Sequence, residues 1–452
     1  MVEDKDFSTA SERFLTWLKG NGATISSRIQ LADLRSSGAG RGIVATENLS
    51  EDEELFSIPR SSILTVETSS LPEAAQKEIN DPWLSLIVAM VYEYLRGSES
   101  QWKSYFDVLP ENFDSLMYWT DDDLEHLQGS AVVDKIGKDG ADTTFTEQLI
   151  PIIGQYANTG NRNNEELLAL CHRMGSTIMA YAFDLEKASN DRSKNEEDGW
   201  EEDEDEEGLL PKGMVPLADM LNADADRNNA KLFYEDDKVV MKTIKPVEAG
   251  QELFNDYGPL PRADVLRRYG YVTDNYAKYD VVEITSSLIK ERAKKQLRLS
   301  ANELDERWKF GEEQGVVDDG YDIAHADNED GQFPEELCVL LNLLATSKVE
   351  FDKLKKKDKL PKPEMSIDAK KLLRTVLVYR YAMYSPESQS MAVDEAGTGD
   401  KRRAMAVQVI EGEKSILEEA VNAVADITLG TKKRAADTLE DEAAAIRNPG
   451  KK

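Results

Sequence analysis

The stretch ELFNDYGPL, residues 252–260, ends an apolar, strand-like run in a sharp turn that carries a tyrosine. The residues around Tyr257 are turn formers, and Pro259 cannot continue a strand because it has no backbone N–H to donate. The pattern therefore predicts that Tyr257 lies at the exit of a strand. A tyrosine in this place is either a core residue that caps a sheet edge or part of a functional site.

Length and composition indicate a large globular protein. A chain of 452 residues, 40% of them apolar, has room for roughly three domains and a buried core. Its two cysteines, Cys171 and Cys338, are far apart and show no metal-ligand or CxxC spacing. We therefore expect neither a disulfide scaffold nor a metal site, and a reducing, intracellular compartment.

Membranes and nucleic acids are the two classes of partner that the sequence disfavours. The longest apolar stretch, residues 83–95, is too short to span a bilayer and contains Glu93, and the N-terminus has no apolar signal core. A formal net charge of −32 repels phosphates, so direct nucleic-acid binding is not expected. The charge favours a basic protein as partner, although solubility alone also explains it.

The order of patterns predicts an α+β fold. A helix is expected over 7–19, strands over 42–45 and 54–58, and a helical region over 82–183. Two β-rich runs on either side of the polar residues 235–237 indicate a hairpin, and helical periodicity dominates from residue 279 onward. The sheet is thus interrupted by a helical insertion and followed by a helical C-terminal domain.

One segment of the insertion has an extreme composition. Ten of the twelve residues 196–207 are acidic, so this segment cannot bury itself and is expected to be a disordered loop. It is either a solvated insertion or an electrostatic antenna for a basic protein.

Two further pieces are ambiguous when each is taken alone. In SGAGRGIVA, Gly38, Gly40 and Gly42 allow close backbone approach, but the piece precedes a strand and does not link a strand to a helix. This context argues against a dinucleotide or phosphate loop and favours a plain turn, with a ligand contact as the alternative. In LADMLNADAD, Asn222 follows an apolar helical frame, where its amide is either a cap or a ligand group.

Together, the glycine-rich start, the helical insertion, ADMLN, NDYG and RRYGYV, in this order, resemble SET-domain protein lysine methyltransferases. The similarity is to the branch of Rubisco large-subunit methyltransferase and the fungal ribosomal-protein lysine methyltransferases, and it covers roughly residues 10–430. It implies a SET domain, with small β-sheets and a knot-like crossing, in two parts: 1–81 and 209–278. The implied remainder is a helical insertion (82–208), a helical substrate-binding domain (279–430) and a disordered tail (431–452).

The resemblance implies S-adenosyl-L-methionine as cofactor, a lysine of a basic protein as substrate, and Tyr257 as the catalytic residue. The implied cofactor-binding residues are Ala39, Gly40, Arg41, Tyr181, Asn222, Ala223, Tyr257, Tyr269 and Tyr271, and the implied substrate-lysine residues are Ala180, Tyr181, Phe183 and Asp219. For Phe183 and Tyr271, ordinary core packing is an equal alternative. Ala223 departs from the histidine that most SET domains carry after the asparagine, which affects cofactor affinity more than the chemistry.

The chemistry gives the phenol a task. Lysine is methylated as the neutral amine, although free lysine titrates near ~10.4, so a site must favour deprotonation by desolvation and by the sulfonium charge. The remaining requirement is alignment of amine, methyl carbon and sulfur, which can supply up to about 7 to 11 kcal/mol. The oxygen of Tyr257 would hold methyl and amine by weak C–H···O and N–H···O contacts.

The most direct interpretation is a monomeric lysine methyltransferase of a large-subunit ribosomal protein, located in the nucleus or the cytoplasm. Two alternatives stay open: the same chemistry on a histone or another nuclear protein, and a non-catalytic acidic escort for a basic protein. The basic triplet 432–434 is either a weak nuclear signal or a chance feature of an exposed tail.

Overall fold

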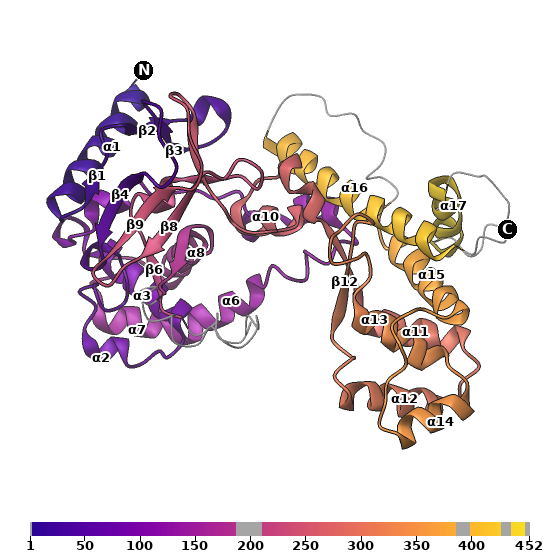
Figure 1. The fold of residues 1–452 in the computed structure, drawn as a ribbon. Helices are drawn as coiled ribbons and strands as arrows, with labels where there is room; N and C mark the ends of the chain where they lie inside the picture. The colour runs from indigo at the N-terminus through magenta and orange to yellow at the C-terminus, as the bar shows by residue number, and fades with distance from the viewer. Residues whose placement is uncertain (1, 187–209, 386–397, 426–434, 448–452) are drawn as a thin grey trace. The chain divides into compact units, whose positions relative to one another are not determined.

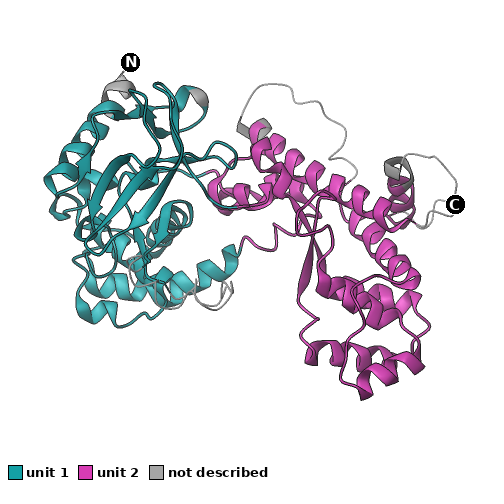
Figure 2. Ribbon diagram, viewed as in Figure 1, with its two compact units in different colours: residues 1–113, 137–258 teal, residues 114–136, 259–452 magenta. Residues whose placement is uncertain are grey.

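The computed structural model of the chain divides into two compact units (Figure 2). Unit 1 consists of Met1–Phe113 and Gly137–Gly258, and unit 2 of Asp114–Ile136 and Pro259–Lys452. The structure describes residues 2–186, 210–385, 398–425 and 435–447. The acidic segment 196–207 and the basic triplet 432–434 lie outside the described residues.

Unit 1 contains three small sheets (Figure 1). The first, in the order β1-β4-β9-β8, consists of β1 (Thr24–Ile25), β4 (Glu54–Pro59), β9 (Lys238–Thr243) and β8 (Ala230–Tyr234). The second, in the order β2-β3-β10-β7, consists of β2 (Ile29–Asp33), β3 (Arg41–Ala45), β10 (Glu252–Asn255) and β7 (Asn222–Ala223). The third pairs β5 (Ala182–Asp184) with β6 (Lys212–Met214). The expected hairpin is confirmed, since β8 and β9 are antiparallel neighbours joined at residues 235–237.

The helices of unit 1 cover these sheets and share their core. They are α1 (Val2–Gly20), α2 (Glu73–Gln76), α3 (Pro82–Leu95), α4 (Lys103–Phe106), α6 (Lys138–Thr144), α7 (Ile150–Tyr156) and α8 (Asn164–Tyr181). Helix α3 begins where Asp81 accepts a hydrogen bond from Leu84 N, and α8 begins with a capping box at Asn163. Aromatic side chains of α1 pack on those of α4: Phe14 and Trp17 both stack against Tyr105.

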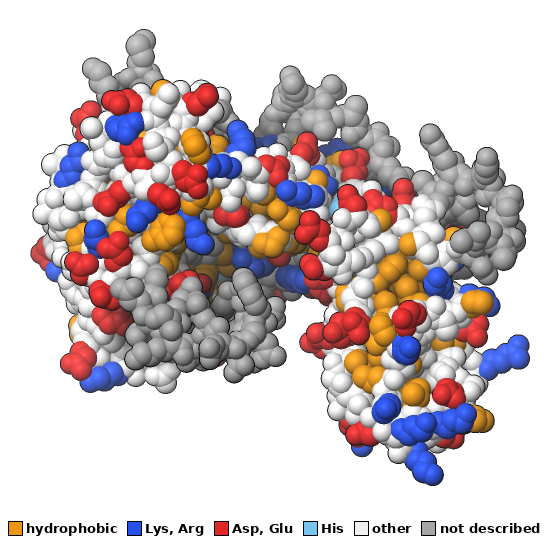
Figure 3. All heavy atoms as spheres, viewed as in Figure 1, with side chains coloured by type: hydrophobic (Ala, Val, Ile, Leu, Met, Phe, Trp, Pro, Cys, Tyr) orange, Lys and Arg blue, Asp and Glu red, His pale blue; other side chains and the backbone are white. Residues whose placement is uncertain are grey.

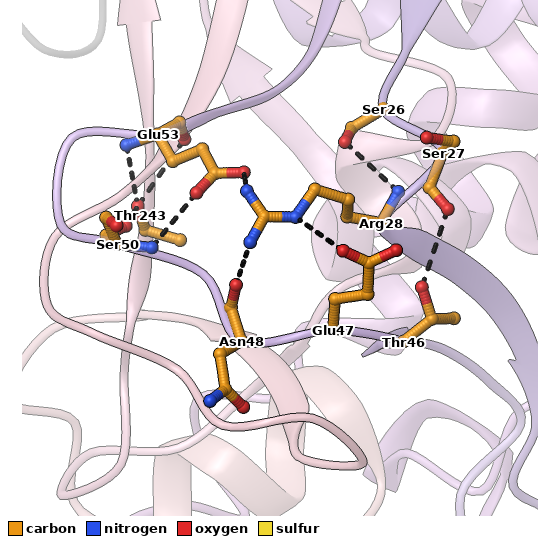
Figure 4. Close-up of polar contacts among 9 residues, drawn as sticks. All are labelled: Ser26, Ser27, Arg28, Thr46, Glu47, Asn48, Ser50, Glu53 and Thr243. Carbon is orange, nitrogen blue, oxygen red and sulfur yellow. Dashed lines mark hydrogen bonds and ion pairs between the residues drawn. The ribbon is translucent and has the colours of Figure 1, made fainter.

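Hydrogen bonds and ion pairs of Arg28 connect the residues before β2 to the loop between β3 and β4 (Figure 4). The Arg28 guanidinium, just before β2, bonds the Glu53 carboxylate, the Asn48 carbonyl and Glu47. Glu53 in turn accepts from Ser50 N, and its own N–H donates to Thr243 Oγ1. These bonds fix the loop between β3 and β4 against β9, so the sheet that carries β3 has a defined position within unit 1.

Unit 2 is mostly helical. Its helices are α5 (Asp121–Leu124), α10 (Arg262–Tyr269), α11 (Ser286–Gln296), α12 (Ala301–Glu313), α13 (Glu335–Ala345), α14 (Lys348–Lys356), α15 (Ile367–Tyr381), α16 (Thr398–Val424) and α17 (Ala435–Arg447). A two-stranded antiparallel sheet, β11 (Val281–Thr285) and β12 (Gly320–Ala324), lies among them. The α+β fold class is confirmed. Among the residues that the structure describes, no helix is long and apolar enough to cross a membrane.

Three features differ from the expected organisation. Residues 114–136 of the expected insertion belong to unit 2, because Leu116, Trp119 and Leu127 are buried in its core. The pair β11–β12 was not expected in a helical region, and the C-terminal part of unit 2 begins at Pro259, not at residue 279. Within the expected disordered tail, 435–447 forms α17, because an apolar face of this helix is buried in the core of unit 2.

Candidate active site

The second sheet of unit 1 brings together three segments that are far apart in the sequence. Strand β10 pairs with β3 on one side, with Leu253 opposite Ile43. On its other side it pairs in parallel with β7, with Phe254 opposite Asn222. The glycine-rich start, the ADMLN piece and the NDYG piece therefore meet on adjacent strands of one sheet.

Close packing joins these segments at Gly42. A Cβ at this position would overlap Leu34 and would lie 2.8 Å from Glu252 Oε1 and 3.1 Å from Asn222 Nδ2. Asn222 Nδ2 donates to Glu252 Oε1 at 2.6 Å and to the Arg41 carbonyl at 3.4 Å. Burial raises the pKa of Glu252 above its usual value, and the bond from Asn222 partly offsets this rise.

The turn before β3 is closed by its own backbone. Leu34 N donates to the Gly40 carbonyl at 2.9 Å, Ala39 N donates to the Leu34 carbonyl, and Gly38 has a positive φ of 83°. A Cβ at Gly40 would meet nothing within 4 Å, so this side of the turn is open. The Arg41 side chain faces α1 and α4 instead: it donates to Ser11 Oγ and the Val108 carbonyl.

Tyr257 lies two residues after β10, as predicted from its sequence context. The Asp256 carboxylate accepts from Gly258 N at 2.8 Å and from Asn228 Nδ2 at 2.9 Å. Gly258 has a positive φ of 79°, which glycine adopts without strain. The turn that presents Tyr257 is therefore fixed from both sides.

Two side chains that hold this sheet in place by hydrogen bonds were not predicted. Asn229 clamps β10, since its amide bonds both the Glu252 carbonyl and Phe254 N. Glu252 holds the Asn222 amide. The available signal was the alternation within ELFN, which places Glu252 and Phe254 on one face of the strand and Leu253 on the other.

A buried carboxylate lies after β6, in the short helical turn Ala218–Met220. Asp219 is 8% exposed, accepts from the Tyr105 hydroxyl, and its Oδ1 has no hydrogen-bond partner. Burial raises the pKa of Asp219 to about 7. The preceding Leu217 has a φ of 77°, which is strained for a side chain of this kind. The resemblance implies a role only for the backbone carbonyl of Asp219, so the pairing of its side chain with Tyr105 is not predicted from the sequence.

The end of α8 carries the other predicted substrate residues. Ala180 is buried, Tyr181 is the last residue of the helix, and Phe183 lies in β5 opposite Gly213. The Tyr181 phenol contributes to the raised pKa of Tyr105, after burial and Asp219. Tyr181 therefore lies close enough to Tyr105 to influence its pKa.

Tyr269 and Tyr271 belong to unit 2. Tyr269 ends α10, Gly270 follows in the left-handed conformation, and the two phenol rings lie with centroids 6.2 Å apart. Burial raises the pKa of Tyr269. The structure brings these two residues together and, separately, places Asn222, Ala223 and the strand before Tyr257 on one sheet.

Two of the histidines contact carboxylate side chains. His172 lies beside Asp142, and His325 lies 3.1 Å from Glu419. Among residues 2–186, 210–385, 398–425 and 435–447, no group of His, Cys, Asp or Glu could hold a metal ion. The predicted site residues described above offer an amide, a buried carboxylate, phenols and backbone groups, all of which can hydrogen-bond a ligand.

Comparison with known proteins agrees with this arrangement. A SET domain model matches residues 40–258. Ribosomal lysine N-methyltransferase 4 of Saccharomyces cerevisiae (strain ATCC 204508 / S288c) is 34% identical over 361 residues, covering 75% of this chain and 72% of that protein. N-lysine methyltransferase setd6 of Xenopus laevis is 30% identical over 375 residues, covering 76% of each chain. The solved SET domain of LSMT bound to lysine and AdoHcy matches with a TM-score of 0.67 at 19% identity, covering 96% of this chain and 98% of that chain.

Proposed function

Because the chain belongs to the SET-domain family of protein-lysine N-methyltransferases, we propose that it methylates a lysine of a basic large-subunit ribosomal protein. The observation that carries the proposal is the single sheet in which β3, β10 and β7 meet, with Asn222 locked to Glu252 and Tyr257 at the exit. The methyl donor is S-adenosylmethionine, as in the solved relative bound to AdoMet.

The residues present fit this cofactor. The open side of the turn at Ala39, Gly40 and Arg41 offers backbone groups to its amino-acid end. Asn222 uses its Nδ2 for Glu252, and its Oδ1 is left to accept a hydrogen bond from the cofactor's ammonium group. Ala223 would contact the adenine through its backbone. The aromatic role that the resemblance implies for Tyr269 and Tyr271 stays a prediction.

S-adenosylmethionine supplies an electrophilic methyl group on a positively charged sulfur. In the mechanism that we propose, the chain aligns the amine with that methyl group. The Tyr257 oxygen accepts weak hydrogen bonds from the methyl and amine groups, and carbonyls at Ala180, Tyr181 and Asp219 orient the amine. Phe183 would form one wall of the lysine channel and exclude water from it.

In this proposal the Asp219 side chain, on the same short turn as the carbonyl that would orient the amine, would act as a further acceptor. With its pKa raised to about 7, the carboxyl is partly ionised at neutral pH, and its Oδ1 is unpartnered. It would stabilise the incoming ammonium group until the amine loses its proton. Tyr105 holds the carboxyl in this orientation.

Two arguments support a basic ribosomal protein as the substrate, which we call the client: the similarity to the yeast relative and the net charge of this chain. The name of the yeast relative points to a ribosomal protein, and a chain with a net charge of −32 is suited to a basic partner. Such a client would be met in the nucleus or the cytoplasm.

The test is transfer of labelled methyl from S-adenosylmethionine into hypomethylated ribosomal proteins and core histones, assayed side by side. Label on one large-subunit ribosomal protein is the expected result. Label on a histone alone would move the client to chromatin. No label on either, with cofactor binding intact, would contradict the client proposal and favour a non-catalytic escort.

A further inference from the structure

We propose that Phe7 of helix α1 is a positioning residue for the cofactor: it holds the turn at residues 38–41 in the shape that binds the amino-acid end of S-adenosylmethionine. This role rests on the proposed function, because it requires that the turn contacts the cofactor. It extends the site to a helix that contributes no residue to the sheet described above. The side chains involved are Phe7 and Ser11 of α1, with Arg35 and Arg41 at the turn.

Two arginine side chains lie over the Phe7 ring. The guanidinium carbon of Arg35 is 4.1 Å from the ring centroid, and that of Arg41 is 3.9 Å from it. At these distances both cations stack on the electron-rich faces of one ring. Arg35 is the first residue of the short helical turn Arg35–Ser37, and Arg41 is the first residue of β3. One side chain of α1 therefore contacts both ends of the glycine-rich turn.

Hydrogen bonds fix the direction of each guanidinium. Arg41 Nε donates to Ser11 Oγ at 3.1 Å, so this arginine is bound to α1 by a hydrogen bond as well as by the ring. Arg35 Nε and Nη2 donate to the two carboxylate oxygens of Asp33 at 2.9 and 2.6 Å. Asp33 is the last residue of β2. The two arginines that contact the Phe7 ring are thus held from α1 and from β2.

The Phe7 ring is an important partner for the charge of Arg41. On the face shown in Figure 3, acidic and basic side chains are interspersed, so a surface cation has carboxylates nearby. Arg41, in contrast, is half-buried and forms no ion pair with the residues that the structure describes, since its hydrogen bonds go to neutral oxygens. Burial and, after it, the charge of Arg35 lower the pKa of Arg41, and Asp33 offsets part of this. The face of the Phe7 ring stabilises the charge that burial disfavours.

Helix α1 is itself packed in the core of unit 1. Phe7 continues a row of buried side chains on one face of the helix, formed by Ala10, Phe14 and Leu18 at the spacing of an amphipathic helix. Phe14 also stacks on Tyr105, with ring centroids 6.0 Å apart. The position of the Phe7 ring is therefore determined by a helix that is anchored in the core.

The turn that Phe7 supports is glycine-rich and open on one side. Two backbone hydrogen bonds of Leu34 close it, one with Gly40 and one with Ala39. A Cβ at Gly40 would meet nothing within 4 Å, and Gly38 has a positive φ of 83°. Glycine leaves the backbone many conformations, and ordering a loop when a ligand binds costs affinity. Because Phe7 contacts both ends of the turn, it orders the turn before the cofactor binds.

The part of the cofactor that depends on Phe7 follows from this arrangement. Backbone groups at 39–41 would contact the amino-acid end, whereas Ala223 would contact the adenine. S-adenosylhomocysteine carries the amino-acid end. The compound 5′-methylthioadenosine has the same nucleoside and a thioether but lacks the amino and carboxyl groups. Loss of positioning should therefore weaken binding of the first ligand and spare the second, while a general loss of folding would weaken both.

The experiment measures the affinity of the full chain for both ligands by titration calorimetry, with 5′-methylthioadenosine measured by displacement. Phe7→Leu keeps an apolar side chain and removes the aromatic face. Phe7→Tyr keeps the face and is the rescue variant. Leu18→Val is the matched control, because it reduces packing of the same helix in the core near its other end. A double variant, Phe7→Leu with Ser11→Ala, also removes the acceptor of Arg41 Nε and is the second test.

We expect Phe7→Leu to bind S-adenosylhomocysteine about fivefold more weakly than the unaltered chain, and the double variant about tenfold more weakly. Binding of 5′-methylthioadenosine should stay within about twofold in both. Phe7→Tyr and Leu18→Val should bind both ligands within about twofold of the unaltered chain. Equal weakening of both ligands by Phe7→Leu, or unchanged binding of S-adenosylhomocysteine by the double variant, would overturn the proposal.

Methyl transfer to ribosomal protein separates the role of Phe7 from the function on which it rests. If Phe7 positions the turn, the KM for S-adenosylmethionine rises about fivefold in Phe7→Leu at unchanged kcat. Ribosomal methylation with an unchanged KM would overturn the role of Phe7 and keep the proposed function. The expected difference between the two ligands without any ribosomal methylation would keep the role of Phe7 and contradict the client.

Discussion

Replacing Gly42 by alanine tests whether the glycine-rich start is a packing position or a flexible loop. The backbone of Gly42 lies outside the left-handed region, so alanine meets no conformational penalty there. Its Cβ, however, would overlap Leu34 and approach Glu252 Oε1 at 2.8 Å and Asn222 Nδ2 at 3.1 Å. The last two atoms are the acceptor and donor of one hydrogen bond, so making room for the methyl group moves both partners.

The magnitude follows from two opposing terms. Overpacking lowers the free energy of unfolding by about 1–3 kcal/mol. Alanine also restricts the unfolded chain more than glycine does, which raises the free energy of unfolding by about 0.4–1 kcal/mol. The net loss is therefore about 1–2 kcal/mol. For a unit of roughly 150–250 residues each kcal/mol shifts Tm by about 2–4 °C, so Tm should fall by about 2–8 °C. Disturbing the Asn222 bond should also weaken S-adenosylmethionine binding by about fivefold.

Gly40→Ala is the matched control, because its Cβ would meet nothing within 4 Å. Thermal unfolding of both variants shows whether Gly42 is a packing position, and calorimetry gives their affinity for the cofactor. We expect Gly40→Ala to unfold at or slightly above the temperature of the unaltered chain. A Gly42→Ala protein as stable as Gly40→Ala would refute the packing argument.

Three further changes probe the same site. Asn222→Ala leaves the half-buried Glu252 without its donor, so calorimetry should show about tenfold weaker S-adenosylmethionine binding, and stability should fall by about 1–3 kcal/mol. Asp256→Ala loosens the turn of Tyr257, so single-turnover rates should fall about five- to tenfold at nearly unchanged cofactor affinity; an unchanged rate would speak against the turn as a positioning element. Asp219→Asn tests the raised pKa of about 7 of the Asp219 carboxyl. The carboxyl binds its proton more tightly in the folded than in the unfolded chain. The protonated carboxyl therefore stabilises the fold fully below pH 4, and this stabilisation is lost as pH rises through 7. Denaturation at pH values of about 5 and about 8 should show the unaltered chain losing up to about 3 kcal/mol relative to the variant, and parallel pH profiles would disprove it.

Local patterns predicted the parts of the fold that depend on neighbours in the sequence. The hairpin of β8 and β9 is one such part, because alternating apolar residues and a polar turn lie within fifteen residues of each other. The exit turn of Tyr257 is another, since Asp256 and Gly258 determine it locally.

The missed features all depend on partners distant in the sequence. Glu252 belongs to the stretch 252–260 from which the turn of Tyr257 is predicted. Its partner Asn222, however, is thirty residues away and meets it only through the parallel register of β10 and β7. Tyr105 lies 114 residues before Asp219, on a four-residue helix without a distinctive pattern. No pattern within residues 114–136 indicates that this segment packs in unit 2 and not with the rest of the insertion. One of its partners there, Arg402, which holds Asp123, lies 279 residues further on.

The most direct test of the central claim is the rate of methyl transfer from labelled S-adenosylmethionine by the Tyr257→Phe variant. Cofactor binding, measured on the same preparation, is the control for an intact site. The account predicts transfer by the unaltered chain and a loss of about 100-fold in the variant, because the phenol oxygen that aligns the methyl group is gone. Transfer by Tyr257→Phe at the rate of the unaltered chain would contradict the account.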